Sequence, residues 1–252
     1  PLSTWLTAPN AFPDHTVENH GIVHPDYIAA ISEMVRSAIA FRLADRRIPD
    51  AVTFNADETF DRLMRLSLPG GTHLYPHGTD YTPRRIDSFF QACDTVPLSP
   101  NPTRKAYFLR SLACLEAMAD AGPELPMSAW VGIPCDLGST WGLTQNYMMC
   151  RLFGDGGSAL PDAELETDLA GVHHSEMGRF IVHRTSDTLS SFSWHPGAGT
   201  PAMMALTMPL SPDTLCYPLP LGYLGEVREH ETGGKARPEV RFHREAVSKD
   251  RS

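Results

Sequence analysis

Lysine is scarce in this chain of 252 residues: Lys105, Lys235 and Lys249 are its three lysines, so 18 of the 21 basic residues are arginines. Against 30 acidic residues this gives a formal net charge of -9. Nonspecific nucleic-acid binding depends on neutralising phosphates, so this acidic balance argues against a nucleic-acid partner. It also weighs against a polyanionic substrate, unless the arginines are gathered in one groove.

Other absences narrow the class of protein. No apolar run approaches the ~18 to 20 residues that cross a bilayer, so we expect no membrane insertion. The N-terminus has no signal-peptide pattern, but the chain begins at Pro1 and not at methionine, so we expect a piece of a longer protein. We expect that protein to be secreted or periplasmic. The five cysteines form no C-x-x-C pair, which argues against a disulfide framework or a cysteine zinc site.

The apolar spacing changes along the chain. It is helical at first and alternating later, which predicts an α+β fold: a helical hairpin array over 1–160, followed by an antiparallel β domain over 161–252. The predicted helices are 25–46, 49–68, 82–93, 103–121 and 141–153, and the predicted strands are 180–184, 189–194, 202–210, 221–228 and 240–243. In the first hairpin, Phe180, Val182, Phe192 and Trp194 should lie against a core.

Residues 14–27 (DHTVENHGIVHPDY) are the densest polar stretch, and they lead directly into the first predicted helix. An asparagine amide can bind a carboxylate or an oxyanion, a neutral histidine can accept a proton, and a tyrosine hydroxyl can donate one. Asn19, His20, His24 and Tyr27 therefore suit proton abstraction next to a carboxyl group. The alternative is that these side chains satisfy loop backbone groups and cap the helix.

A second polar and aromatic loop precedes the third predicted helix. Aromatic rings stack on sugars and arginines bind carboxylates, so we predict a sugar-binding role for this loop. Its candidate residues are His73, His77, Asp80, Tyr81, Arg84 and Arg85. The alternative is an ordinary exposed loop with a capping residue. Because one helix runs back between the two polar loops, we expect them to open on the same cleft.

A third group consists of His173, His174 and Glu176, with His183 on the next predicted strand. It can form a zinc site, although its spacing matches no strong ligand motif. A hydrogen-bonded histidine pair on a sheet is the alternative, and we expect no cofactor.

Four segments resemble polysaccharide-lyase-like proteins of the heparinase II/III type: ENHG at 18–21, HPDY at 24–27, YPHGTDY at 75–81, and the hairpin running from 182 to 194. The resemblance implies an α/α toroid joined to an antiparallel β-sandwich. It implies that Asn19 neutralises a uronate carboxylate, that His20 or His24 is the base, and that Tyr27 or Tyr81 is the acid. A closed toroid needs about ten or more helices, so part of such a fold lies outside this chain.

The leading hypothesis is therefore a polysaccharide lyase that acts on a uronate-containing polysaccharide by β-elimination. A glycoside hydrolase on an α/α toroid is one alternative; it needs two carboxylates, for which Asp14, Glu18, Asp26 and Asp80 are candidates. The other is a noncatalytic carbohydrate-binding protein that uses His77, Tyr81 and Arg84.

Overall fold

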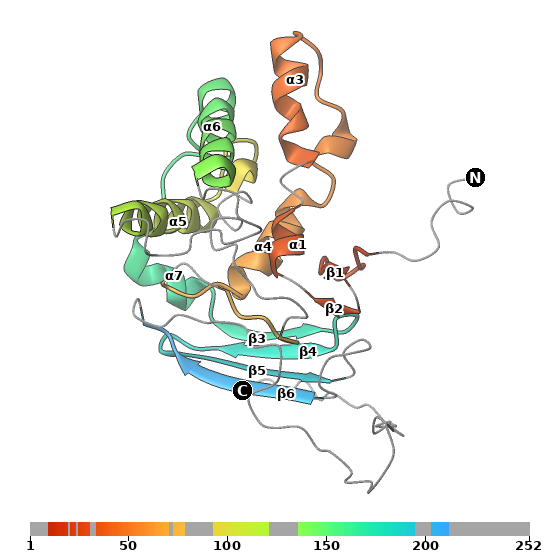
Figure 1. The fold of residues 1–252 in the computed structure, drawn as a ribbon, viewed down its shortest axis with the longest axis vertical. Helices are drawn as coiled ribbons and strands as arrows, with labels where there is room; N and C mark the ends of the chain where they lie inside the picture. The colour runs from red at the N-terminus through yellow and green to blue at the C-terminus, as the bar shows by residue number, and fades with distance from the viewer. Residues whose placement is uncertain are drawn as a thin grey trace, which may run out of the picture.

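The computed structural model describes residues 10–19, 21–23, 25–30, 34–70, 73–78, 93–120, 136–194 and 203–211. Within these residues the fold is α+β, with helices on one side of a four-stranded sheet (Figure 1). The helices are α1 (Pro25–Ala29), α3 (Ser37–Leu43), α4 (Ala56–Arg65), α5 (Pro102–Asp120), α6 (Asp136–Phe153) and α7 (Asp162–Asp168), with a 3-10 turn, η2, at Asp50–Val52.

The main sheet is antiparallel and follows the chain order β3-β4-β5-β6. Its strands are β3 (Gly171–Ser175), β4 (Phe180–Arg184), β5 (Thr188–Trp194) and β6 (Met203–Pro209). Along β4, Phe180, Val182 and Arg184 are buried while the residues between them are less so, which is the alternation expected of a strand with one face toward a core. A separate two-stranded sheet joins β1 (Glu18–Asn19) to β2 (Ile22–Val23).

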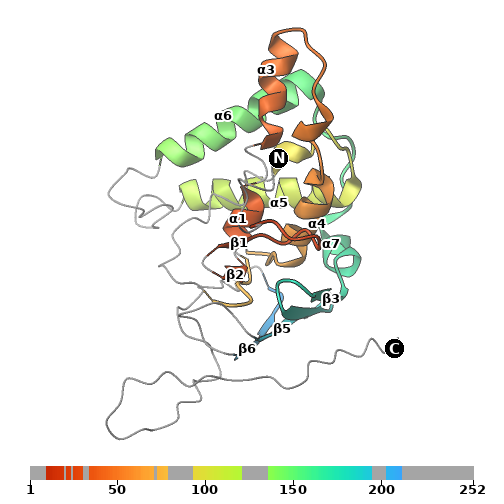
Figure 2. The ribbon, with the colours of Figure 1, turned by 90° about the vertical axis from the view of Figure 1, so that its right-hand side faces the viewer.

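The largest core lies between α4 and the inner face of the main sheet. Phe60 and Leu63 of α4 belong to the same buried cluster as Phe180, Val182 and Leu189 of the sheet. Helix α4 also packs against α1 and α5, so it is the central support of the helical layer (Figure 2).

A second, smaller core lies among the helices away from the sheet. Val35, Ala38 and Met149 are fully buried in it and join α3 to α6. Helix α5 packs against α7. At the start of α5, the Asn101 side chain accepts hydrogen bonds from the backbone N–H groups of Thr103 at 2.9 Å and Arg104 at 3.1 Å, which caps the helix.

Three of the predicted helices are described, in modified form, and one is broken. Helices α5 and α6 match the predictions at 103–121 and 141–153, although α6 begins five residues earlier. The helix predicted over 49–68 begins only at Ala56, because η2 precedes it and Asn55 takes a left-handed conformation with φ of 56°. The single helix predicted over 25–46 is wrong: α1 ends at Ala29 and α3 begins at Ser37. Most of the helix predicted over 82–93 lies outside the described residues.

The strands β4, β5 and β6 match their predictions, whereas β1, β2, β3 and α7 had not been predicted. Phe180, Val182 and Trp194 are buried as expected, but Phe192 is 43% exposed, so its predicted core position is wrong. The alternation of β5 places Phe192 on the sheet face opposite the helices. The strands predicted over 221–228 and 240–243 lie outside the described residues.

Two further sequence expectations, on membrane insertion and on cysteines, can be compared with the structure only for the described residues. None of the described helices is both long enough and apolar enough to cross a membrane. The three described cysteines, Cys93, Cys114 and Cys150, are free thiols.

Candidate functional site

The first polar loop forms a small structure that we call the entrance hairpin: β1, the turn at Gly21, and β2, followed by α1. Gly21 has φ of 82°, a left-handed conformation that glycine adopts without a side-chain clash. The Glu18 carboxylate closes the turn by accepting a hydrogen bond from the Gly21 N–H at 2.6 Å. This turn folds the chain back so that β1 lies beside the first turn of α1.

The entrance hairpin brings together two of the predicted catalytic side chains. The Asn19 amide Nδ2 donates a hydrogen bond to the Tyr27 hydroxyl oxygen at 3.0 Å. Tyr27 is 38% exposed, and the bond lies at the protein surface. An amide donor and a phenolic proton donor therefore occupy one accessible place, within reach of the same small group.

The second polar loop contacts the entrance hairpin on its buried side. The Val23 backbone N–H donates to His77 Nδ1 at 3.0 Å, and the His77 ring lies edge-on to Phe180 with centroids 6.0 Å apart. Next to His77, the Pro76 carbonyl accepts a hydrogen bond from the Ser193 hydroxyl at 2.6 Å. Because Nδ1 accepts, the neutral His77 ring carries its proton on Nε2. The second loop thus joins the hairpin to the main sheet.

His73 and His77 are inside the protein, with exposed fractions of 2% and 3%. His73 Nε2 lies 2.8 Å from the Tyr107 hydroxyl. Burial, together with the positive charge of Arg184, holds the pKa of His73 well below its ordinary value, so this ring is neutral at physiological pH. Both histidines support the second loop from within.

Two carboxylates that a hydrolase could use are engaged in local structure. Asp14 accepts hydrogen bonds from the Thr16 hydroxyl at 2.7 Å and the Ser175 hydroxyl at 2.6 Å, and from the backbone N–H of Met177 at 3.2 Å. Partial burial raises the pKa of Asp14, but the hydrogen bonds outweigh it and hold the pKa below the ordinary value. Asp14 therefore stays ionised, and Glu18 is bound to the Gly21 turn.

Six predicted site residues lie outside the described residues: His20, His24, Asp80, Tyr81, Arg84 and Arg85. The contact between Val23 and His77 shows that the described parts of the two loops are neighbours. Whether they open on one cleft stays a prediction, because Tyr81 is among the six.

The histidines considered for a metal site are divided between the two faces of the main sheet. His173 points toward α4, whereas His174 and His183 belong to the opposite face, since side chains alternate along β3 and His183 pairs with Val172. His174 stacks on Trp194, with ring centroids 6.0 Å apart. In the part of the chain that the structure describes, no three histidine, cysteine, aspartate or glutamate side chains group as metal ligands do.

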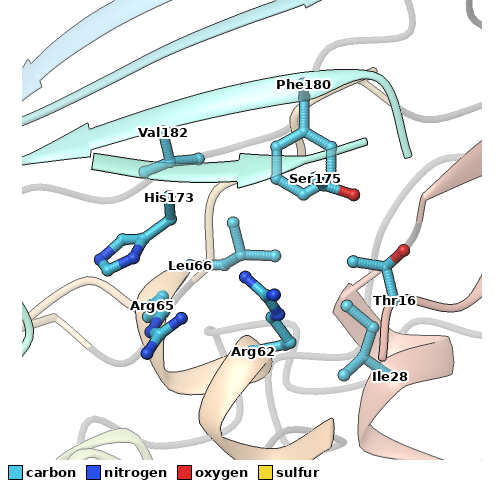
Figure 3. Close-up of a pocket in the computed structure, with 9 residues that line it drawn as sticks. All are labelled: Thr16, Ile28, Arg62, Arg65, Leu66, His173, Ser175, Phe180 and Val182. Atoms are coloured by element: carbon cyan, nitrogen blue, oxygen red, sulfur yellow. The ribbon is translucent and has the colours of Figure 1, made fainter. Parts of the chain in front are cut away.

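A cavity between α4 and the main sheet contains residues that the sequence predictions missed (Figure 3). We call it the arginine cavity. From α4, Arg62 and Arg65 point toward β3, from which His173 and Ser175 point back. Its lining is completed by Thr16, Ile28, Leu66, Phe180 and Val182. The excess of arginine over lysine and the i, i+3 spacing of the two arginines were the available sequence signals.

No protein-family profile, curated protein or solved structure matches this chain.

Proposed function

We propose that this protein is a polysaccharide lyase that cleaves a uronate-containing polysaccharide by β-elimination. The observation that carries the proposal is the hydrogen bond between the Asn19 amide and the Tyr27 hydroxyl at the exposed end of the entrance hairpin. The resemblance of residues 18–27 and 75–81 to heparinase II/III-type lyases supports the same activity.

Elimination requires three groups around one sugar residue. A donor must hydrogen-bond the uronate carboxylate, because the proton on C5 is too weakly acidic to leave without stabilisation of the developing charge. A base removes that proton, and the C5–H electron pair forms the C4–C5 double bond as the C4–O bond breaks. The departing glycosidic oxygen then takes a proton from an acid.

The entrance hairpin supplies residues for each of these tasks. In the proposal, the Asn19 amide turns from Tyr27 to the uronate carboxylate, and Tyr27, one hydrogen bond away, protonates the leaving oxygen. His20 follows Asn19 directly in the chain and is the base, with His24 as the alternative base. Tyr81 is the alternative acid.

The surroundings favour elimination over hydrolysis. A glycoside hydrolase needs one carboxylic acid that is protonated at working pH and a second carboxylate across the scissile bond. The pKa of Asp14 is lowered, which is unsuitable for the acid, and both Asp14 and Glu18 are bound to backbone groups nearby. Asn19 and Tyr27 have no assigned role in hydrolysis.

The helical layer is compatible with the toroid that the proposal includes. Helices α3 and α6 pack against each other, as do α4 and α5, and a toroid consists of helices packed in such pairs. The proposal is that these helices are part of an α/α toroid, and that the main sheet is part of the β-sandwich next to it.

The test is product formation from a panel of uronate polymers, such as alginate, pectate, hyaluronan and heparan sulfate. Elimination gives an unsaturated product that absorbs in the near ultraviolet. Asn19→Ala and Tyr27→Phe should each lower the rate ~10²- to 10³-fold, and His20→Ala about as much or more, because each removes a group that acts in the transition state.

Matched control variants separate chemistry from folding. Asn55→Gly removes an exposed asparagine amide outside the entrance hairpin, at a left-handed position that glycine tolerates, and Tyr147→Phe alters a tyrosine that is 64% exposed on α6. Both controls should retain activity, and all variants should melt within a few degrees of the parent. The proposed mechanism would be ruled out if Asn19→Ala and His20→Ala each kept near-normal activity. It would also be ruled out if reducing ends formed without an unsaturated product.

A further inference from the structure

The described arginines with a mostly buried side chain have carboxylate partners. Arg36 contacts Asp94, Arg104 contacts Asp57 and Asp61, Arg110 contacts Asp162 and Glu166, and Arg184 contacts Glu166. A buried guanidinium without an anion is costly, so these pairs are what physical chemistry requires. The arginines of the cavity differ from these four because they lack such carboxylate partners among the described residues.

Arg62 and Arg65 are half-buried, and within the described residues neither forms a salt bridge. Arg62 donates from Nε to the Asp14 carbonyl oxygen at 2.9 Å, a neutral partner. No hydrogen bond from the Arg65 guanidinium is seen in the described part of the chain. Burial and the neighbouring charge of Arg62 lower the pKa of Arg65. Two like charges are thus held side by side in a protein whose net charge is -9.

The carboxylates near these arginines are already bound. Asp61 accepts two hydrogen bonds from Arg104, at 2.8 and 3.0 Å. Asp14 accepts from Thr16, Ser175 and Met177. Neither aspartate can form a salt bridge in the cavity without losing these bonds, although Asp61 still acts on Arg65 through its charge. These two carboxylates therefore leave the donors of Arg62 and Arg65 that face the cavity without an anionic partner.

His173 senses the same positive charge. Burial, and then Arg65, Arg62 and Arg184, lower its pKa to about 4, although a hydrogen bond to the Leu169 carbonyl oxygen at 3.2 Å acts in the opposite direction. The ring is therefore neutral near pH 7 and adds no third charge. Ser175 and Thr16 complete the polar part of the lining.

The cavity is small and partly open. Its volume is about 10 Å³, which is room for about one water molecule or one oxygen atom of a larger group. Guanidinium groups bind carboxylate, sulfate and phosphate oxygens through charge-assisted hydrogen bonds. A sugar ring does not fit inside, whereas a charged oxygen does.

We propose that Arg62 and Arg65 form a binding site for a small oxyanion, one of whose oxygens enters the arginine cavity while the rest of the group faces its opening. The anion is a carboxylate or sulfate group, either free in solution or carried by an acidic saccharide. The inference rests on the arginine cavity and is independent of the proposed lyase activity.

The test measures thermal unfolding of the parent protein and its variants with sodium sulfate or sodium glucuronate, each compared with sodium chloride at equal ionic strength. A ligand that binds the folded state raises the melting temperature. Sulfate also stabilises proteins generally, so the informative quantity is the difference between variants. Arg62→Gln and Arg65→Gln should weaken binding ~10-fold or more, the change expected from loss of one charge-assisted hydrogen bond.

Arg46→Gln is the matched control, since Arg46 is an exposed arginine outside the cavity. It should keep the anion response of the parent. Arg65→Lys keeps the charge but not the fork of donors, so it should bind with intermediate affinity and serves if Arg65→Gln folds poorly.

A second readout follows the imidazole resonances of His173 during a pH titration of the parent. A bound anion offsets the charge of Arg62 and Arg65, so the pKa of His173 should rise from about 4 when sulfate or glucuronate is added. A response to glucuronate alone identifies a carboxylate ligand, and a response to sulfate alone a sulfate ligand. Equal responses in the parent and in Arg65→Gln, or no response to either anion beyond that to chloride, would overturn the proposal.

Discussion

Two regions between the helices and the main sheet handle buried positive charge in opposite ways. Beside α7, Arg110 and Arg184 share the carboxylate of Glu166, and Arg184 also donates to the Ser67 carbonyl oxygen at 2.6 Å. In the arginine cavity, Arg62 and Arg65 lie close to each other's charge, and among the described residues neither forms a salt bridge. The first arrangement is complete within the chain and stabilises the fold. In the second, the described residues supply no salt-bridge partner, and this is where we propose that an anion binds.

The largest effect should come from breaking the complete arrangement. Arg184→Met removes a fully buried guanidinium and leaves the Ser67 carbonyl without this donor. Removing one partner of a buried ion pair costs about 3 to 5 kcal/mol, and the lower end is expected because Glu166 keeps Arg110. Urea unfolding measures the loss, with Arg151→Met on the exposed face of α6 as the control. A loss below ~1 kcal/mol would mean that the two regions do not differ as described.

A smaller effect should appear in the arginine cavity, where the contribution of His173 to the free energy of unfolding should depend on pH. The pKa of His173 is about 4 in the folded protein and near its ordinary 6.5 when unfolded, so the unfolded chain binds the proton first as pH falls. The contribution of His173 to stability is thus present above pH 6.5 and is lost as pH falls toward 4.

His173→Gln isolates that contribution. The free energy of unfolding of the parent minus that of the variant should decrease as pH falls from about 6.5 to about 4. Asp94, whose burial raises its pKa to about 6 against the opposing effect of Arg36, changes stability in the opposite sense over this range. Because Asp94 is present in both proteins, its effect cancels in the difference. A difference that stays constant with pH would contradict the lowered pKa of His173.

The smallest effect on stability should come from an exposed pair of an arginine and an aspartate that belongs to neither region. Arg47 and Asp50 form a salt bridge of 2.8 Å with both side chains more than four-fifths exposed. Such pairs are screened by water and salt, so Arg47→Gln should change the free energy of unfolding by ~0.5 kcal/mol or less. A loss comparable to that of Arg184→Met would show that exposure does not govern the value of these pairs.

The sequence predicted those elements whose signals are local. Helix α5 was predicted because its apolar residues recur at helical spacing, and β4 and β5 because their apolar residues alternate. The break between α1 and α3 was not predicted, because an apolar stripe continues through it. There the packing of α1 on α4 and of α3 on α6 decides the structure.

The candidate site was predictable to the same extent. Asn19 and Tyr27 are eight residues apart on a tight hairpin and a helical turn, so their meeting follows from local structure. The burial of His77 depends on Phe180 of β4, which lies more than a hundred residues further along the chain, and His73 is buried as well. The arginine cavity combines Thr16, Arg62 and His173 from three distant segments, and no local pattern predicts such an arrangement.

The hydrogen bond from the Ser175 hydroxyl to Asp14 joins residues 161 positions apart. At a synthesis rate of ~5 to 20 residues per second, roughly 8 to 30 seconds pass on the ribosome between the two residues. Before β3 and β4 are synthesised, Asp14 lacks the hydrogen-bond donors Ser175 and Met177, and His77 lacks its contact with the ring of Phe180. The surroundings of the entrance hairpin are therefore complete only once β3 and β4 have been made, so a nascent chain stalled before β3 lacks these contacts.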